Sequence, residues 1–254
     1  MTCFKNTVVL GATSGLAEAF VRRLAAHPEA RRIVLVARSA EKLAVVADDL
    51  RVRSDDRVTV LKLTGDCRDE GFQSEMIRSA ADFCAEGIDG VLVTHGFLPE
   101  SEAGATDPVV LTDSINVNFT STARITAQLA PVLARRESRT WLAVVSSVAG
   151  DRGRAANPGY GAAKAGLQAW LSGLRGRHWK TGLRIIDIRP GFVDTPMTAE
   201  MDKGPLFASP DRVATDIEKA IRKRKSICYT PWFWWPIMTA IKALPESLFQ
   251  RLKL

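Results

Sequence analysis

The chain has 254 residues, of which 46% are hydrophobic and 25% charged, a balance typical of a globular protein with one large domain or two small ones. Its net charge of +7 suits an anionic ligand or surface, but no zinc-finger, homeodomain or RNA-binding motif accompanies it, so we expect no nucleic-acid partner. The cysteines are Cys3, Cys67, Cys84 and Cys228. They form no CxxC pair and the histidines are far apart, which argues against a disulfide framework or a metal site. We expect a reducing, cytoplasmic compartment, because the apolar N-terminal stretch is also too short for a signal peptide.

Short, nearly continuous apolar runs alternate with longer segments of helical periodicity. The runs predict strands at 7–11, 32–37, 58–63, 90–94, 141–146 and 183–188. The periodic segments predict helices at 15–27, 40–52, 69–86, 109–135 and 157–179. Continuous apolar runs are typical of strands covered on both faces, and their alternation with helices indicates parallel pairing. We therefore predict an α/β fold: a single Rossmann-type, doubly wound domain with a seven-stranded, mostly parallel sheet.

The C-terminal stretch differs in composition from the rest. The basic run 222–225 is followed by Trp232, Phe233, Trp234 and Trp235 and then by an apolar helical pattern. We predict a main domain over residues 1–228 and an amphipathic, aromatic-rich extension over 229–254. Basic residues and tryptophans suit contact with an anionic membrane surface, on the inner face of the membrane, but aromatics that cover the core or form a subunit contact explain the pattern equally well. The uncharged stretch 226–241 is too short to predict a membrane span.

A glycine-containing turn separates the first predicted strand from the first helix. Glycine lets the backbone turn sharply and approach a ligand, and the start of a helix favours a pyrophosphate. The residues predicted to bind it are Gly11, Thr13, Ser14, Gly15 and Leu16. The spacing is not GxGxxG, so an ordinary tight turn is the alternative.

The second predicted strand is followed by Arg38 and Ser39, with no carboxylate before Glu41. In dinucleotide-binding folds an acidic residue at this place bonds the ribose hydroxyl of NAD. A guanidinium instead pairs well with a phosphate, so the sequence favours NADP(H) as cofactor, with a solvated surface arginine as the alternative.

Tyr160 and Lys164 share one face of a predicted helix, and Ser147 follows a predicted strand. Reduction of a carbonyl needs a proton for the oxygen as hydride reaches the carbon. A phenol is a poor acid at neutral pH unless a cation stabilises the phenolate, which Lys164 can do, while Ser147 can hold the carbonyl oxygen. A half-buried tyrosine beside a surface lysine is the alternative.

These motifs, in this order, resemble the classical short-chain dehydrogenases/reductases. The resemblance runs from about residue 6 to 230 and includes GATSGLA at 11–17, INVNFTS at 115–121 and RPGFVDTPM at 189–197. It implies an NAD(P)-dependent Ser-Tyr-Lys-Asn site in which Asn118 holds a water of the proton relay. It also implies a homodimer or homotetramer, and a substrate lid at 196–212.

The same resemblance assigns further cofactor contacts. It implies that Asp66 contacts adenine, that Lys164 contacts the nicotinamide ribose, and that Val193 and Thr195 contact the carboxamide. The implied cofactor residues beyond the first turn are Asp66, Gly96, Tyr160, Lys164, Pro190, Gly191, Val193 and Thr195. The chain departs from the family pattern at Ala17, where the family has glycine, and at Val93-Thr94-His95, where it has Asn-Asn-Ala.

A narrower resemblance concerns residues 146–170 and the tail 229–252, which look like the bacterial decaprenylphosphoryl-2-keto-ribose reductases. It implies reduction of a lipid-linked keto-sugar produced by a flavin-dependent oxidase partner, in cell-wall biosynthesis. Arg152 and Arg154 lie between the predicted catalytic serine and tyrosine, where two guanidiniums can clamp a substrate phosphate. Solvated loop charges are the alternative reading of the arginines. For the whole protein, the alternatives are a broad carbonyl or 3-oxoacyl reductase and an inactive cofactor-binding scaffold.

Overall fold

Seven parallel strands form the centre of the protein, whose computed structural model describes residues 4–252. The strands are β1 (Asn6–Leu10), β2 (Arg32–Ala37), β3 (Thr59–Thr64), β4 (Gly90–Val93), β5 (Thr140–Val145), β6 (Leu183–Pro190) and β7 (Ile227–Thr230). They are hydrogen-bonded in the order β3-β2-β1-β4-β5-β6-β7, and each of these pairings is parallel. The predicted doubly wound sheet is confirmed. Cys3 lies outside the described residues.

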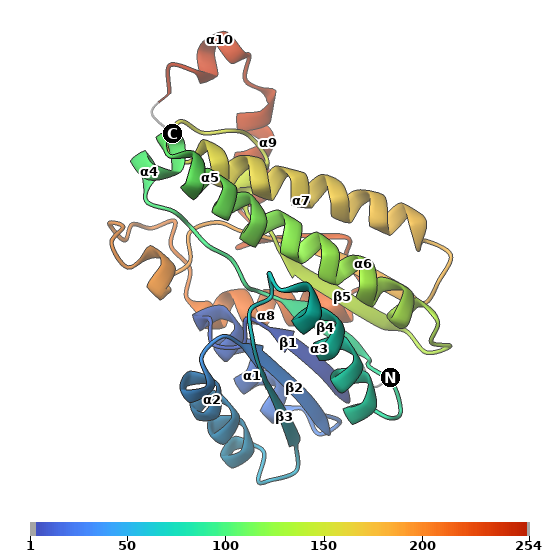
Figure 1. Ribbon diagram of the computed structural model, residues 1–254. Helices are drawn as coiled ribbons and strands as arrows, with labels where there is room; N and C mark the ends of the chain where they lie inside the picture. Colours follow the sequence, from blue (N-terminus) through green and yellow to red (C-terminus); the bar gives the residue numbers. More distant parts are fainter. Residues whose placement is uncertain (1–3, 253–254) are drawn as a thin grey trace.

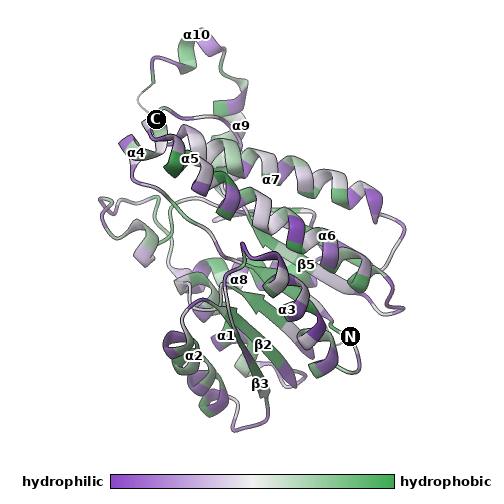
Figure 2. Ribbon diagram, in the orientation of Figure 1, coloured by the Kyte–Doolittle hydropathy of each residue, from purple (hydrophilic) through white to green (hydrophobic). Residues whose placement is uncertain are grey.

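Helices cover both faces of the sheet (Figure 1). One face carries α1 (Gly15–Ala26), α2 (Ala40–Arg53) and α8 (Pro210–Arg222); the other carries α3 (Glu70–Phe83), α6 (Ser121–Ala134) and α7 (Pro158–Arg177). Each layer closes its own apolar core, one around Phe20 and Leu35 and the other around Met76 and Leu167. Figure 2 shows hydrophobic strands flanked by helices of mixed hydropathy, which is the pattern expected when strands are buried on both faces.

Two predicted cofactor residues turn out to begin helices. The Ser14 hydroxyl accepts a hydrogen bond from the Ala17 N–H at 3.3 Å, and the Ser39 hydroxyl accepts one from the Lys42 N–H at 3.3 Å. Such caps satisfy backbone groups that a helix leaves unpaired at its first turn. The serines therefore fix where α1 and α2 start, and with them the edge of the crevice described next.

The strand order reverses between β1 and β4, because the chain first winds outward to β3 and then returns to the other side of β1. In an open parallel sheet this reversal leaves a crevice at the carboxyl ends of the strands. The segments that leave β1, β4, β5 and β6 at this edge contain Gly11, Gly96, Ser147 and Gly191. Topology therefore gathers four separately predicted segments in one place.

The long helix predicted at 109–135 is interrupted. The structure has α4 (Ser101–Thr106), then α5 (Pro108–Ile115), a π-helical turn at Asn116–Thr120, and α6. A π turn inserts an extra residue into the hydrogen-bond ladder and often occurs at a functional site. The interruption contains Asn118, and no hydrophobic periodicity could have indicated it.

The C-terminal extension returns to the crevice. β7 occupies Ile227–Thr230, so the predicted division between residues 228 and 229 falls inside a strand. The chain continues into α9 (Trp234–Ala243) and α10 (Glu246–Phe249), and Trp234 and Met238 pack on Val148. In Figure 1 both helices lie on the side of the molecule where α4 and α5 begin.

The basic run and the aromatic residues of the tail do not form one surface. Residues 222–225 precede β7 and lie at the amino end of the strands, where Arg224 donates to the Gly182 carbonyl at 2.7 Å. Trp232 and Trp235 follow β7 and are exposed at its carboxyl end. The sequence placed them side by side, but the strand between them carries them to opposite edges of the sheet. Within residues 4–252, none of the helices has the length and apolar character needed to cross a membrane.

Candidate active site

Two adjoining cavities fill the crevice at the carboxyl ends of the strands. The first has a volume of about 480 Å³ and the second about 470 Å³. Both are lined by Thr13, Ser14, Lys42, Thr94, Gly96 and Met197. Because they share these residues, the cavities form one elongated site that begins over β1 and extends in two directions, towards β2–β3 and towards β5–β6.

Ser147, Tyr160 and Lys164 lie on the wall of the first cavity. Ser147 comes two residues after the end of β5, Tyr160 stands in the first turn of α7, and Lys164 is one turn further. Ser147 forms a hydrogen bond with the Tyr160 hydroxyl. The Lys164 Nζ donates to the Val145 carbonyl at 3.1 Å and lies 5.7 Å from the centre of the Tyr160 ring. The fold thus brings together the three side chains that the sequence predicted as a catalytic group.

Burial controls the protonation of this group. It lowers the pKa of the Lys164 ammonium to about 8, although the charge of Asp187 acts in the opposite direction. It raises the pKa of the Tyr160 phenol to about 12, and the hydrogen bond from Ser147 offsets part of that rise. We expected Lys164 to lower the phenol pKa below its ordinary value, but here burial has the larger effect. At pH 7 the phenol is therefore protonated and the neighbouring ammonium is charged.

Asn118 lies behind this group and is fully buried. Its side-chain amide donates to the Phe97 carbonyl at 2.6 Å and to the Ser114 carbonyl at 3.0 Å, and its Oδ1 accepts from the Phe97 N–H at 3.0 Å. A Cβ added to Gly96 would lie 3.1 Å from Asn118 Oδ1 and 3.7 Å from Lys164 Nζ. The asparagine therefore holds the Gly96–Phe97 segment next to the lysine. Its water-holding role stays a prediction.

His95 occupies one of the positions where the chain departs from the family pattern. Its Nε2 lies 2.9 Å from the Ser121 hydroxyl and 3.1 Å from that of Thr122. Burial lowers its pKa to about 4, so the ring is neutral at pH 7. These contacts give the histidine a structural role between β4 and α6.

The turn after β1 has the geometry that a dinucleotide needs. Gly11 has φ +75°, and a Cβ there would lie 2.6 Å from the backbone nitrogen of His95. Ser14 contacts Thr94 through their hydroxyls at 3.1 Å, which ties the turn to β4. Gly15 and Leu16 line the first cavity from the first turn of α1, where helical N–H groups have no partner within the helix. Anionic oxygens are favoured at such a place.

The second cavity is lined by Arg38, Lys42, Asp66 and Arg68. β2 ends at Ala37 and is followed by Arg38, so no carboxylate occupies the strand end. Asp66 accepts hydrogen bonds from Arg68 at 3.0 and 2.8 Å, and these lower the pKa of its carboxyl group. The structure places Asp66 in the same cavity as Arg38, as the predicted roles require. Ser39 caps α2 and is not part of the lining.

The segment after β6 forms the opposite wall of the first cavity. Its four predicted residues all contribute to the lining: Pro190, Gly191, Val193 and Thr195. A Cβ on Gly191 would overlap the indole of Trp234, so the glycine is needed for the C-terminal extension to pack here. The centre of the Phe192 ring lies 5.7 Å from the centre of the Trp234 ring. Phe192 also stacks on Phe207, with 5.2 Å between the ring centres.

The segment predicted as a lid contributes Met197 and Met201 to the first cavity. An isolated parallel bridge joins Val193, three residues before this segment, to Ala208 within it. Lys203 pairs with Asp194 at 2.7 Å near the base of the loop. The loop is thus pinned at its ends while its middle presents apolar side chains to the cavity, which is the arrangement a lid requires. Closure itself stays a prediction.

The two arginines predicted to bind substrate have different surroundings. Arg152 donates to the Ile241 carbonyl at 2.9 Å and the Leu244 carbonyl at 2.5 Å, and it pairs with Glu246 at 2.8 Å. It is not in the lining of either cavity. Arg154 lines the first cavity, and its guanidinium donates to the sulfur of Met238 at 3.4 Å. The structure therefore places Arg154, but not Arg152, in the lining of the candidate active site.

Sequence reasoning missed several residues of the lining. The most notable are Lys42, Arg68, Leu98 and Phe192. Lys42 carried a usable signal, because it lies four residues after Arg38 in the same stretch, at the start of a helix. Leu98 and Phe192 carried none, since an apolar residue in a loop gives no indication that it faces a ligand.

The comparisons with known proteins agree with this geometry. Residues 5–205 match the family model described as short chain dehydrogenase. A relative in Mycobacterium tuberculosis, named an uncharacterized oxidoreductase, is 32% identical over 247 residues, which are 96% of each chain. The chain therefore belongs to the short-chain dehydrogenase family, and the prediction of an oxidoreductase is confirmed.

Solved structures show the same fold at low identity. A short chain dehydrogenase from Burkholderia cenocepacia, solved in complex with NADP, has a TM-score of 0.83 and 19% identity, with all of both chains covered. An actinorhodin polyketide ketoreductase solved with NADPH has a TM-score of 0.74 and 21% identity, covering 85% of this chain and 90% of that one. At this identity the likeness concerns the fold alone.

Proposed function

We propose that the protein is an NADPH-dependent ketoreductase. The observation that carries the proposal is the placement of Ser147, Tyr160 and Lys164 on one wall of a cavity that continues into a second, arginine-lined one. The first cavity supplies acid–base groups and the second supplies positive charge for a phosphate. Both meet at the turn after β1, where a pyrophosphate is favoured.

The residues present fit NADP(H). Gly11 leaves the turn free of a Cβ, and Gly15 and Leu16 present the first turn of α1 to the pyrophosphate. Arg38 and Lys42 would hold the additional phosphate of NADP(H), because the strand end carries no carboxylate to repel it. That the similar structures were solved with NADP or NADPH supports this choice.

The cofactor supplies the hydride, and the chain's own residues handle the oxygen and its proton. Ser147 donates a hydrogen bond to the ketone oxygen and holds it beside Tyr160. Tyr160 donates its proton to that oxygen as negative charge develops there. The charged Lys164 then stabilises the phenolate left behind. Met197 and Met201 line the lid side of the cavity and help to keep water away from the reacting atoms.

Arg154 indicates the class of ketone. Burial lowers the pKa of its guanidinium, and within the described residues it forms no ion pair at less than 4 Å, so a cation faces the cavity without a bound carboxylate. Most of the remaining lining is apolar, including Leu98, Val148, Phe192 and Met201. A ketone that carries both an anionic group and an apolar chain matches this wall. Consistent with the narrower resemblance, we propose a prenyl-phosphate-linked keto-sugar, supplied by a flavin-dependent oxidase.

A broad carbonyl or 3-oxoacyl reductase is the second candidate, favoured by the same apolar lining. The two are separated by assaying NADPH oxidation with a phosphorylated keto-sugar and with a neutral apolar ketone. Under the first proposal, Arg154→Gln raises KM at least tenfold for the phosphorylated substrate and leaves KM for the neutral ketone within about twofold. An equal change with both substrates would favour the second candidate. No turnover with either ketone by the wild-type protein would favour the inactive scaffold.

The proposed membrane contact rests on fewer residues than the sequence suggested. Trp232 and Trp235 are 70% and 59% exposed and flank Trp234 in the chain, which packs over Gly191 of the cavity wall. The basic run lies at the other edge of the sheet. Flotation with anionic vesicles should therefore be lost in the double variant Trp232→Ser, Trp235→Ser. It should persist when Lys223 and Lys225 become Gln, and the reverse result would contradict an aromatic contact. The homodimer or homotetramer implied by the family resemblance stays a prediction.

A further inference from the structure

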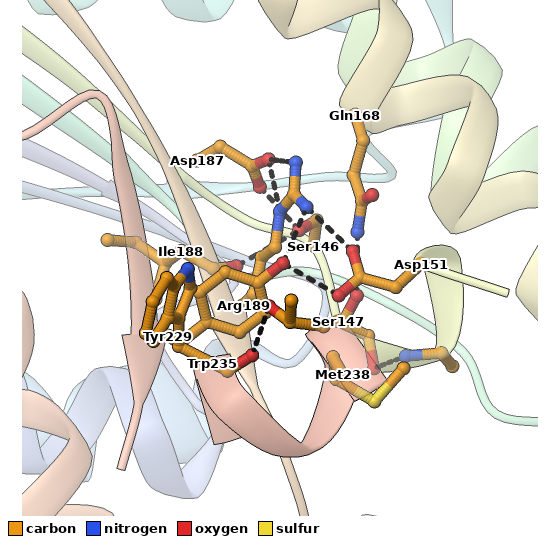
Figure 3. A network of polar contacts seen from close by, with 12 residues as sticks. Ser146, Ser147, Asp151, Gln168, Asp187, Ile188, Arg189, Tyr229, Trp235 and Met238 are labelled. Atoms are coloured by element: carbon orange, nitrogen blue, oxygen red, sulfur yellow. Dashed lines mark hydrogen bonds and ion pairs between the residues drawn. The ribbon is translucent and has the colours of Figure 1, made fainter. Parts of the chain in front are cut away.

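A buried polar network includes Ser146, which directly precedes the proposed catalytic Ser147 in the chain (Figure 3). Asp187, on β6, is fully buried and accepts hydrogen bonds from the Ser146 hydroxyl at 2.5 Å and from Arg189 at 2.8 Å. Arg189 also donates to Asp151 at 2.6 Å, and Tyr229 donates to the other oxygen of Asp151 at 2.7 Å. These residues come from three places in the chain: the end of β6, the loop after β5, and β7.

Within the network itself carboxylates outnumber guanidiniums, although Arg175 faces Asp187 from outside it. The network contains two buried carboxylates and one guanidinium, since Tyr229, whose pKa is raised to about 12 by burial and by its bond to Asp151, is neutral. Buried charges that are not balanced locally act over several ångströms, because the protein interior screens them poorly. A neighbouring cation is therefore stabilised.

Lys164 is such a neighbour. Its Nζ donates to the carbonyl of Val145, which pairs in the sheet with Ile188, the residue after Asp187. Ser146, which bonds to the Asp187 carboxylate, directly precedes the proposed catalytic Ser147. Asp187 is thus linked to both sides of the catalytic group, by a hydrogen bond on the serine side and by its charge on the lysine side.

We propose that Asp187 is a positioning residue that holds the Ser146–Ser147 backbone and keeps the Lys164 side chain charged. The inference rests on the proposed function, in which that charge stabilises the Tyr160 phenolate. Arg189 and Asp151 complete the network and fix the Asp187 carboxylate in place.

Other titratable groups face the same lysine or the same aspartate. His95 lies near Lys164 but is neutral at pH 7, because burial lowers its pKa to about 4. Tyr160 keeps its proton in this range. Arg175, on α7, and Arg189 carry positive charge close to Asp187. Asp187 is consequently the group that supplies negative charge to Lys164 near neutral pH, where it opposes the effect of burial.

The test compares two buried aspartates of the same network. Asp187→Asn and Asp151→Asn each remove one negative charge from a partner of Arg189, but of the two only Asp187 raises the pKa of Lys164. The primary measurement is the titration of the lysine 13Cε resonance in the protein without cofactor, assigned by its loss in Lys164→Met. We expect the Lys164 midpoint to fall by about one pH unit, a tenfold change in the protonation equilibrium, in Asp187→Asn and to stay unchanged in Asp151→Asn.

A second variant covers the case in which Asp187→Asn does not fold. Arg189→Gln leaves both carboxylates and removes their guanidinium, so the Lys164 midpoint should rise. Equal shifts in the two aspartate variants, or no shift in a folded Asp187→Asn or Arg189→Gln protein, would overturn the inference. The alkaline limb of kcat for ketone reduction should move with the NMR midpoint. Because the titration needs no substrate, a wild-type protein that reduces no ketone would refute the proposed function and still leave the Asp187 measurement valid.

Discussion

At the residue scale, the proposed chemistry depends on two groups, Lys164 and Tyr160, whose pKa values burial shifts in opposite directions. The pKa of Lys164 is lowered to about 8 and that of Tyr160 is raised to about 12, in both cases chiefly because a buried charge is poorly solvated. Between pH 6 and about 8 the pair therefore consists of a neutral phenol and a charged ammonium. This is the combination that can donate a proton to a ketone oxygen.

The expected pH dependence of ketone reduction follows from the lowered pKa of Lys164. A lowered pKa means that the neutral amine forms at lower pH than usual, so kcat should be level below about pH 7 and should fall as the pH rises through about 8. The Tyr160 phenol, still protonated there, adds no second limb below pH 10. The measurement is kcat at saturating NADPH between pH 6 and 10. A limb that persists unchanged in Lys164→Met would assign it to another group.

Removal of the proton donor should abolish most turnover. Tyr160→Phe keeps the ring and loses only the hydroxyl, so kcat should fall between a hundredfold and ten-thousandfold, the usual contribution of a general acid. The Kd for NADPH, measured by fluorescence titration, should stay within about threefold of the wild-type value. Trp170→Phe, in the same helix but away from the cavity, serves as the control. Retention of most activity in Tyr160→Phe would remove the tyrosine from the mechanism.

At the element scale, the C-terminal extension is joined to the loop that carries Ser147, the proposed catalytic serine. Arg152 leaves that loop and binds the last carbonyls of α9, and its guanidinium lies 4.1 Å from the centre of the Phe249 ring. A cation at the end of a helix satisfies carbonyls that have no partner within the helix. Trp234 fills the space over Gly191 on the other side of the cavity. The extension therefore supports two walls of the site.

Loss of this arginine should loosen the extension before it affects the main sheet. Arg152→Met removes charged hydrogen bonds at a largely buried position, and we expect a loss of about 2 kcal/mol from the free energy of unfolding. Limited proteolysis should then cut the chain after about residue 240 at least tenfold faster. Lys242→Met, which changes an exposed lysine in the same segment, should behave like the wild type. Identical cleavage of Arg152→Met and wild type would show that the contact is dispensable.

At the scale of the whole molecule, the site lies where the two halves of the sheet meet. Strands β1 and β4 sit at the reversal of strand order, and the two cavities extend from there over both halves. A ligand that fills both cavities contacts segments from β1 to β6 at once. Its binding therefore stabilises the folded chain as a unit rather than one loop.

The preference for NADPH over NADH can be measured as the stabilisation that each cofactor gives to the folded protein. At a concentration of one hundred times Kd, NADPH should stabilise the protein by about 2.7 kcal/mol and raise its Tm by roughly 5–10 °C. NADH at the same concentration should have a much smaller effect, because it lacks the phosphate that Arg38 and Lys42 would bind. Arg38→Asp should reverse the preference, measured by differential scanning fluorimetry. Equal shifts with both cofactors in the wild type would contradict the assignment of Arg38.

The local signals were reliable where chemistry depends on neighbours in the chain. Tyr160 and Lys164 share a face because they are four residues apart in a helix, and Gly11 stands at a strand-to-helix turn that needs a positive φ. Sequence patterns did not predict which side chains are brought together by contacts between segments distant in the chain. Arg152 and Arg154 looked equivalent in the sequence, but one binds the end of α9 and the other faces the cavity.

The amino-acid sequence by itself determined the alternation of strands and helices, the parallel sheet and the serine, tyrosine and lysine of the site, because periodicity and short spacing carry that information along the chain. Only the tertiary structure decided that β7 separates the basic run from the tryptophans of the tail, that a π turn holds Asn118, and that the charge of Asp187 acts on Lys164. Each of these depends on contacts between segments distant in the sequence. Such contacts arise from packing and charge in three dimensions, and no local pattern of residues records them.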